Sequence, residues 1–253
     1  MVGAVIYLHS HILPGIDDGA RTIDDSRELA RKAVGEGIQA IAATPHVRAD
    51  YPTSVRQMEE GVDRLRRDFE QHGIPLSVLP GAEIDLERLE TLPEEELTCF
   101  TLARSGRYLL LEFPYQGWPL GLEQTIFHLR LRGFQPLLAH PERNREVQER
   151  PQRLEAAVAG GALLQITAAS VDGRLGRRCK AAARRLLELR LAHVLASDAH
   201  PPDLRVAGFA TASRALGDEQ LVRYLTAEVP TAIVNGKDVP APPALERGRF
   251  RIF

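Results

Sequence analysis

The sequence predicts an α/β fold in which seven parallel strands form a closed or distorted barrel. Short aliphatic and β-branched runs alternate with longer, charged, amphipathic segments along most of the 253 residues. Strands that read as continuous apolar runs are typical of a parallel sheet that helices cover on both faces. Seven such units favour a barrel over an open sheet, and an α/β barrel of this length is ordinarily a single domain.

Each predicted strand is a short apolar run, and amphipathic segments separate most of them. The expected strands are Ala4–His9, Gln39–Thr44, Leu76–Gly81, Arg107–Phe113, Gln135–His140, Ala162–Thr167 and Ala192–Ser197. The expected helices include Asp24–Glu36, Ser54–His72, Leu122–Arg132, Gln152–Ala159 and Arg174–Leu189. Thr22 and Asp25 have the spacing of a capping box at the start of the first helix.

We expect one domain spanning residues 1–253, with a C-terminal tail from about residue 238. The stretch VPAPPALERGRFRIF is rich in proline and then basic and aromatic. We therefore expect an extended tail that lies on the barrel or on a neighbouring subunit.

Composition narrows the class of protein. The formal net charge of −2 at pH 7 gives no electrostatic basis for a nucleic-acid partner. No apolar run approaches the roughly 20 residues that span a bilayer, and the N-terminus lacks the features of a signal peptide. Cys99 and Cys179 are far apart and lack metal-type spacing, which suits a reducing compartment. We expect a cytoplasmic protein without a membrane span.

Six of the seven predicted strands end in imidazole or carboxylate side chains. These residues are His9, His11, Asp17, Asp18, His46, Glu83, Glu112, His140, Glu142, Asp198 and His200. In parallel barrels the C-terminal strand ends form one face, where active sites lie. Such side chains are poor candidates for burial unless they are paired or coordinated. Nitrogen and oxygen ligands without cysteine suit zinc, manganese or iron, and bridging carboxylates suit a multinuclear centre.

Each of these residues also has a structural interpretation. A single histidine on a strand is more often a hydrogen-bonded core residue than a ligand, and we expect His193 to be one. His72 and His128 fall in helical segments, where we expect them to be solvated. Glu112 could cap a neighbouring loop, and Asp17 could serve the DDG turn through its own backbone. The convergence of five histidines and several carboxylates at equivalent strand ends favours the metal interpretation.

Arginines near the same face are candidates for binding phosphate. Arg143 follows His140 by three residues, and its guanidinium could clamp a phosphate at the rim. A surface salt bridge explains Arg143 equally well, and Arg205 is a weaker second candidate. Tyr51 and Tyr115 could line the approach to the site or pack within loops, and Trp118 has the same two interpretations.

Several of these stretches resemble the polymerase and histidinol phosphatase (PHP) superfamily. They are HSHILPGIDDG, ATPH, GAEI, LLLEFP, AHPERN and SDAH, in the family's order, from His9 to His200. Within the superfamily, the chain resembles the bacterial protein-tyrosine phosphatases of capsule and exopolysaccharide biosynthesis. Tyr7 departs from relatives that carry an acidic residue before the first histidine, but it is not a ligand position.

The resemblance implies a distorted (β/α)7, TIM-like barrel that holds three divalent metals. Manganese is expected, with zinc or iron as alternatives. The first metal would take His9, His11, Glu83 and Asp198. Glu83 would bridge to a second metal, completed by Glu112 and His140. The third would take Asp18, His46 and His200. All nine ligand positions carry suitable residues.

The implied reaction is hydrolysis of phosphotyrosine by a hydroxide that the metals hold, without a covalent phosphoenzyme. Arg143 would neutralise charge on the phosphoryl oxygens, with Arg205 as a further substrate contact. Asp198 or His200 could help to protonate the leaving group, although a phenolate leaves readily. In relatives the substrate is the tyrosine-rich tail of a membrane-associated kinase that controls polysaccharide chain length.

The sequence leaves other functions open. A small-molecule phosphatase of the histidinol-phosphate type would use the same metals with a tighter pocket. The charge balance and the lack of an attached polymerase domain weaken the hypothesis of a nuclease or polymerase-associated module. A non-catalytic binding module would be supported by a lost ligand, and none is lost. The oligomeric state stays open.

Overall fold

Seven strand positions run around a parallel, barrel-like structure in the computed structural model, which describes residues 4–200 and 208–243. Five positions are single strands: β1 (Val5–Tyr7), β6 (Tyr108–Glu112), β7 (Gln135–Ala139), β8 (Leu163–Thr167) and β9 (Val194–Ala196). Two positions are each split in two, as β2 (Ile38–Ala43) with β3 (His46–Val47), and β4 (Ser77–Pro80) with β5 (Glu83–Asp85). The splits divide the ladder into two parallel sheets, with orders β1-β2-β4 and β3-β5-β6-β7-β8-β9.

Within the described ranges, no continuous ladder joins β9 to β1, so the barrel is distorted. One parallel bridge between Ser10 and Ala199 links the chain just beyond the C-terminal ends of these two strands. The His11 amide donates to the Ala199 carbonyl (3.0 Å), and the Asp198 amide donates to the His9 carbonyl (3.1 Å). The distorted parallel α/β barrel predicted from the sequence is confirmed.

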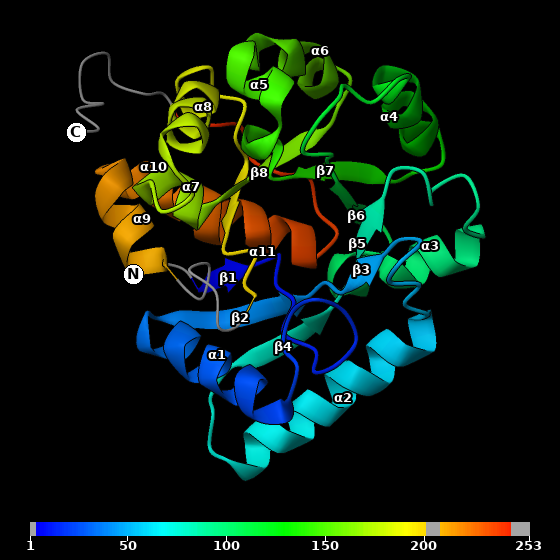
Figure 1. Ribbon diagram of the computed structural model, residues 1–253, viewed down its shortest axis with the longest axis vertical. Helices are drawn as coiled ribbons and strands as arrows, with labels where there is room; N and C mark the ends of the chain where they lie inside the picture. Colours follow the sequence, from blue (N-terminus) through cyan, green and yellow to red (C-terminus); the bar gives the residue numbers. More distant parts are fainter. Residues whose placement is uncertain (1–3, 201–207, 244–253) are drawn as a thin grey trace.

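Helices cover the outside of both sheets (Figure 1). The three-stranded sheet packs against α1 (Ile23–Gly35) and α2 (Val55–Gln71), which both begin with a capping box. On the other half lie α4 (Leu122–Leu131), α5 (Arg145–Glu149), α6 (Leu154–Ala159) and α8 (Arg177–Glu188). Short turns of helix complete the loops: α3 (Glu94–Phe100), η1 (Leu102–Arg104), η2 (Pro141–Arg143), η3 (Pro151–Arg153) and α7 (Ala168–Asp172).

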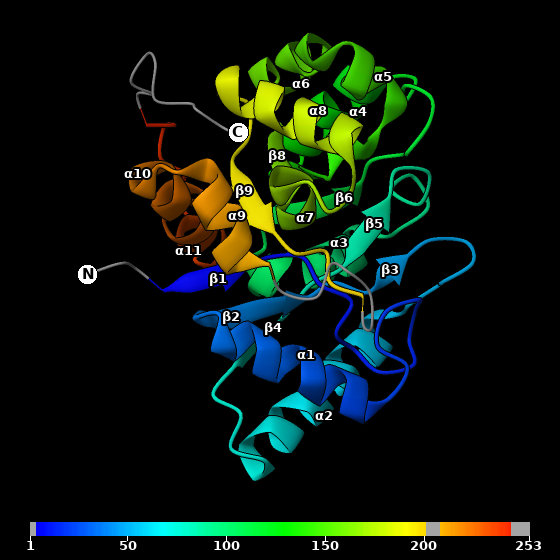
Figure 2. The same ribbon diagram turned by 60° about the vertical axis from the view of Figure 1, so that its left-hand side comes forward.

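The gap between β1 and β9 is filled by C-terminal helices that the sequence analysis did not predict. They are α9 (Phe209–Leu216), α10 (Glu219–Arg223), the π-helical turn η4 (Tyr224–Glu228) and α11 (Val229–Val234). Figure 2 shows them beside β1 and β9, and η4 packs against both strands. Each segment is short, Gly217 separates α9 from α10, and Pro230 cannot donate a backbone hydrogen bond, so the periodic signal is weak.

The described part of the tail lies on the barrel. Asp238 pairs with Arg107 at the start of β6, and the Tyr108 hydroxyl donates to the Lys237 carbonyl (2.5 Å). The Arg190 guanidinium donates to the Pro242 carbonyl (2.5 Å). Residues 244–253 lie outside the described ranges. That the whole chain forms one domain stays a prediction.

His193 is a buried histidine that hydrogen-bonds to the neighbouring strand, as its interpretation as a core residue requires. Its Nδ1 accepts from the Leu164 amide (3.2 Å), and its own amide donates to the Leu164 carbonyl (2.9 Å). Burial lowers the pKa of His193 to about 4, so the native state holds this ring neutral.

We expect the free energy of unfolding to fall as the pH drops from about 6.5 toward 4, because the unfolded chain binds a proton that native His193 excludes. This histidine contributes up to about 3 kcal/mol to the loss. His193→Asn should flatten the slope in urea unfolding over this pH range. Equal slopes for wild type and variant would contradict the assignment.

Candidate metal centre

Imidazole and carboxylate side chains converge at the C-terminal ends of the strands. All nine predicted metal ligands belong to groups whose nitrogen and oxygen atoms lie within 4.8 Å of one another. The groups are His9, His11 and Asp198; His9, Glu83 and His140; His46, Glu83 and Glu112; and His11, Asp18, His46 and His200. Eight of the nine side chains are almost fully buried, and Asp18 is the partly exposed member.

Five distances among four atoms of the cluster match the spacing of a tetrahedral metal site. His9 Nε2 and His11 Nε2 lie 3.2 Å apart, and Glu83 Oε2 lies 3.2 Å and 3.3 Å from them. Asp198 Oδ1 lies 3.3 Å from both imidazole nitrogens. Ligand atoms about 2.0–2.1 Å from a tetrahedral ion lie roughly 3.3 Å from one another. These four side chains therefore fit a divalent cation.

Glu83 connects this group to its neighbours. Its Oε1 lies 3.0 Å from His140 Nε2, and its Oε2 lies 3.1 Å from His46 Nδ1. His46 Nδ1 also lies 3.5 Å from Glu112 Oε2. A carboxylate with both oxygens facing separate imidazoles has the arrangement that a bridging ligand requires.

Asp18 anchors a third group at the mouth of the site. Its Oδ1 lies 3.2 Å from His200 Nε2 and 3.4 Å from His46 Nε2. Hydrogen bonds with His200 and His46 hold the pKa of Asp18 below its usual value, so the carboxylate is ionised. His46 thus faces this group with one ring nitrogen and the Glu83–Glu112 group with the other.

Unsatisfied buried atoms support the presence of cations. Glu83 Oε2, Glu112 Oε2 and His46 Nδ1 are buried without a hydrogen-bond partner. Burying such groups without compensation costs on the order of 1–3 kcal/mol each, and more when they are charged. Coordination to a metal would satisfy all three, so the residues present fit the group.

The two central carboxylates have opposite pKa shifts. Burial disfavours ionised Glu83, but His9, His11 and His140 outweigh it and hold its pKa well below the usual range. Burial and the charge of Glu83 raise the pKa of Glu112. A cation between them would remove this repulsion, because both could then be ionised.

Asp17 and Gln165 orient two of the histidines. Asp17 was named from the sequence only as a strand-end carboxylate and turn residue, and Gln165 was not predicted. His9 Nδ1 donates to Gln165 Oε1 on β8 (2.8 Å), and His11 Nδ1 donates to Asp17 Oδ2 (2.7 Å). Each bond leaves Nε2 as the free lone pair that a metal requires. Asp17 also accepts from the Gly19 amide (3.0 Å), so its predicted turn role is confirmed alongside this second one.

The backbone bends sharply where the strands deliver these side chains. The predicted strands reach His140 and Ser197, whereas β7 ends at Ala139 and β9 ends at Ala196. His140 (φ 39°) and Asp198 (φ 48°) adopt left-handed conformations that ordinary residues avoid, and such strain clusters at functional sites. A Cβ at Gly19 would lie 2.2 Å from the His11 carbonyl oxygen, so only glycine fits there.

Three residues of the stretch HPERN, which follows β7, make different contacts. Glu142 is fully buried and points away from the cluster, and its Oε1 accepts from the Thr167 amide (2.9 Å) and the Ser170 hydroxyl (2.7 Å). Arg143 forms an ion pair with Asp198. The Asn144 side chain caps α5 and donates to the carbonyls of Pro114 and Gly117, which fixes the loop after β6.

Two guanidinium groups flank a cavity of about 160 Å³ that opens onto the cluster. Arg143 lies 4.7 Å from the centre of the Tyr115 ring. Arg48 lies 2.9 Å from Glu112 Oε1 and 5.2 Å from the centre of the Tyr51 ring. Arg48 was not predicted from the sequence, because its spacing from His46 alone does not indicate a site residue. Arg205 lies outside the described residues.

The family model for capsular polysaccharide synthesis, CpsB/CapC, matches residues 5–235. The chain belongs to this family. Tyrosine-protein phosphatase YwqE of Bacillus subtilis is 43% identical over 202 residues, which cover 78% of this chain and 77% of YwqE. Putative tyrosine-protein phosphatase CapC of Staphylococcus aureus is 32% identical over 199 residues, covering 78% and 77%.

The fold of this CpsB/CapC family member also matches a solved relative. The similarity is to a crystal structure described with YwqE from Bacillus subtilis and CpsB from Streptococcus pneumoniae as metal-dependent tyrosine phosphatases. The TM-score is 0.83 at 36% identity, covering 96% of this chain and all of the other. The resemblance to capsule and exopolysaccharide phosphatases is confirmed. None of the described helices has the length and apolar character to cross a membrane.

Gln165→Leu should weaken divalent-metal binding about 10- to 100-fold, because His9 loses the partner that fixes its tautomer and ring orientation. Competition with a fluorescent chelator, read at several metal concentrations, measures the affinity. Gln152→Leu, an exposed glutamine before α6, provides the control. Unchanged affinity in Gln165→Leu would contradict the positioning role.

Proposed function

We propose that this chain is a metal-dependent protein-tyrosine phosphatase, and therefore a phosphoric monoester hydrolase. The observation that carries the proposal is one cavity bordered by the nine-ligand cluster and two guanidinium groups. Phosphate is a dianion with three exposed oxygens, so cations on one side and arginines on the other suit it. The names of the family relatives support tyrosine phosphate as the target.

We propose three divalent ions, held as the resemblance implies. In this assignment His9, His11, Glu83 and Asp198 hold one; Glu83, Glu112 and His140 hold a second; and Asp18, His46 and His200 hold a third. All nine residues belong to the candidate metal groups, which also place His46 with Glu83 and Glu112. Manganese is the proposed metal, with zinc or iron as alternatives. When bound, such ions activate water and neutralise charge on the phosphoryl group.

Arg143 is the proposed phosphate-orienting side chain. Its pairing with Asp198 and its stacking on Tyr115 fix the guanidinium at the edge of the cavity. Arg48 lines the same cavity and is a second proposed contact to the phosphate. Two fixed cations that require no rearrangement stabilise charge that develops during transfer. Arg205 stays a further proposed contact.

Asp198 and His200 fit metal-binding roles better than proton donation. Burial opposes ionisation of Asp198, but His9, His11 and Arg143 hold its pKa well below the usual range. The His200 ring lies between the Asp198 carbonyl (Nδ1, 3.0 Å) and Asp18 Oδ1 (Nε2, 3.2 Å), so both of its nitrogens face oxygens of the cluster. A phenolate leaving group suits this arrangement because it departs without strong acid assistance.

Aromatic walls favour an aryl phosphate over a small polar one. Tyr115 stacks on His140 with ring centres 5.5 Å apart, and Tyr51 stacks on His46 at 5.9 Å. Tyr115 is 44% exposed, which leaves part of its ring available to a substrate. The proposed physiological substrate is a phosphotyrosine tail of a polysaccharide-biosynthesis kinase in the cytoplasm.

Metal-stripped protein reloaded with manganese, zinc or iron should hydrolyse a phosphotyrosine peptide and leave a phosphoserine peptide nearly untouched. His140→Ala should lower kcat by at least about 100-fold, because a ligand of the cluster is lost. Released phosphate is the readout, with metal content measured in parallel. Preference for histidinol phosphate would overturn the substrate. Bound metal without turnover of any substrate would favour a binding module.

Arg143→Ala should reduce kcat/KM for the same peptide about 100-fold or more, because a charge-assisted contact to the phosphate is lost. Arg143→Lys should recover only part of it, since a lysine cannot bind two oxygens in a fork. Metal content, measured for both variants, separates this effect from damage to Asp198. Full activity in Arg143→Ala would contradict the role.

A further inference from the structure

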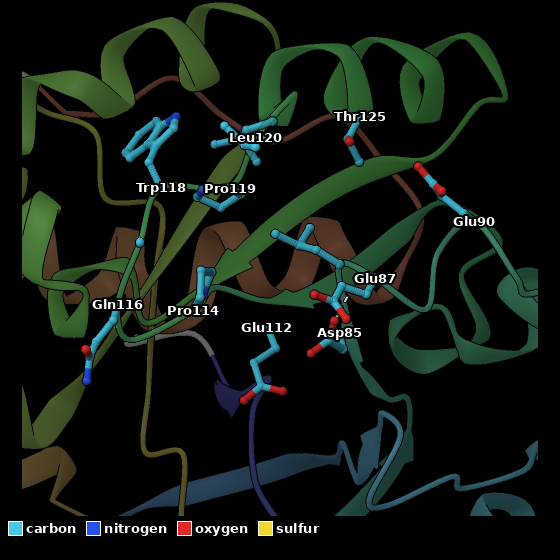
Figure 3. A pocket seen from close by; sticks show the side chains of 13 residues that line it. Asp85, Glu87, Glu90, Glu112, Pro114, Gln116, Trp118, Pro119, Leu120 and Thr125 are labelled. Carbon is cyan, nitrogen blue, oxygen red and sulfur yellow. Dashed lines mark hydrogen bonds between the residues drawn. The ribbon is translucent and has the colours of Figure 1, made fainter.

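A larger groove of about 580 Å³ opens beside the metal centre (Figure 3). Residues of β5 and the turns after it form one side, and the loop from β6 to α4 forms the other. Its lining includes Asp85, Glu87, Glu90, Trp118, Pro119 and Leu120. The reaction proposed above uses none of these six side chains.

The first wall carries three carboxylates without a counterion. Among the described residues, no lysine, arginine or histidine lies within ion-pair distance of Asp85, Glu87 or Glu90. Asp85 Oδ1 accepts from the Glu87 amide (2.7 Å), whereas Glu87 and Glu90 extend into solvent. They belong to none of the candidate metal groups in the described chain. The wall is therefore negatively charged, but its carboxylates do not converge on one point as metal ligands do.

The second wall is largely apolar and already in place. Leu120 is 97% exposed. Trp118 packs edge-on against Phe113 with ring centres 5.8 Å apart, and the Arg153 guanidinium lies over its ring at 4.0 Å. Asn144 holds the Pro114 and Gly117 carbonyls at 2.8 Å each, and the Gly117 amide donates to Glu146 (3.2 Å). An exposed leucine on a loop that is pinned in this way is preorganised to bury apolar surface.

Glu112 joins the groove to the metal centre. It lines the groove, and its Oε2 belongs to the group with His46 and Glu83. Glu112 is only 9% exposed, and its Oε2 has no hydrogen-bond partner. Asp85 lies opposite Glu112 in the β5–β6 ladder, so the acidic wall begins at the edge of the centre.

We propose that this groove binds the residues that flank the phosphotyrosine and selects a chain with a lysine or arginine next to an apolar residue. This inference rests on the proposed function, which places the phosphate in the cavity beside Arg143 and the flanking residues toward the groove. The basic side chain would face Glu87 and Glu90, and the apolar one would pack on Leu120 and Trp118. Charge complementarity and continuity with the centre favour this occupant over a second copy of the chain.

The test uses phosphotyrosine peptides that carry one lysine or one glutamate at each flanking position in turn. Wild type should prefer the best lysine peptide over its glutamate partner about 5- to 10-fold in kcat/KM, as two surface ion pairs allow. The preference should shrink as salt is raised. Glu87→Gln/Glu90→Gln should reduce it to about 2-fold or less.

Matched controls separate a local effect from the overall charge. Glu95→Gln/Glu96→Gln removes the same charge at two exposed residues of α3 that do not line the groove, and it should keep the wild-type preference. Leu120→Ser should weaken the preference for leucine over glycine beside the lysine about 3-fold, at little cost in stability because Leu120 is exposed. An equal loss in both glutamate variants would overturn the proposal.

Phenyl phosphate and a non-hydrolysable peptide complete the design. Phenyl phosphate has no flanking residues. If Glu87→Gln/Glu90→Gln lowers kcat/KM equally for phenyl phosphate and for the lysine peptide, the proposal that the groove binds flanking residues would also be overturned. Lysine and glutamate peptides that carry a phosphonate analogue of phosphotyrosine cannot be hydrolysed. Their affinities therefore measure binding in the groove without turnover. Selective binding without hydrolysis would support the groove and contradict the proposed chemistry. Concentration-dependent dimerisation that Leu120→Ser abolishes would instead assign this wall to a second copy.

Discussion

The gathering of nine ionisable side chains in one cluster, eight of them buried, is the constraint on which the rest of the structure depends. Carboxylates and imidazoles at this density repel or remain unsatisfied unless cations are present, as the unpartnered oxygens of Glu83 and Glu112 illustrate. Binding energy from the proposed metals would therefore become folding energy for this face of the barrel. The strained backbone at His140 and Asp198 is tolerated because the surrounding packing holds it and the ligands need that direction.

The barrel is distorted at the points where the strands carry residues of the cluster. The chain leaves the regular ladder at Thr44–Pro45 and at Gly81–Ala82, and short strands resume at His46 and Glu83. The break places two members of the cluster, His46 and Glu83, at the first residues of β3 and β5. At the opposite side, the bridge between Ser10 and Ala199 replaces a ladder and lets both strand ends turn toward the centre. The C-terminal helices then fill the space that the missing ladder leaves.

The sequence predicted the seven strand positions and the imidazole and carboxylate side chains that converge at the strand ends, because both signals are local. An apolar run and the polar residue after it can be read without knowing the partner strand. Gln165 and Arg48 escaped because their roles arise only from residues 156 and 64 positions away in the chain. The helices between residues 209 and 234 escaped because their stability comes from packing on β1 and β9 rather than from their own periodicity.

Chemistry and recognition are supplied by different parts of the same loops. In HPERN, His140 faces the cluster, Arg143 faces the cavity, and Asn144 fixes the loop that carries the apolar wall of the groove. In the β5 region, Glu83 serves the cluster, while Asp85 begins the acidic wall two residues later. The residues proposed to bind phosphate and those proposed to contact the flanking peptide are thus held by shared turns. A shift of either turn would misplace both, which ties substrate selection to the geometry of the metal centre.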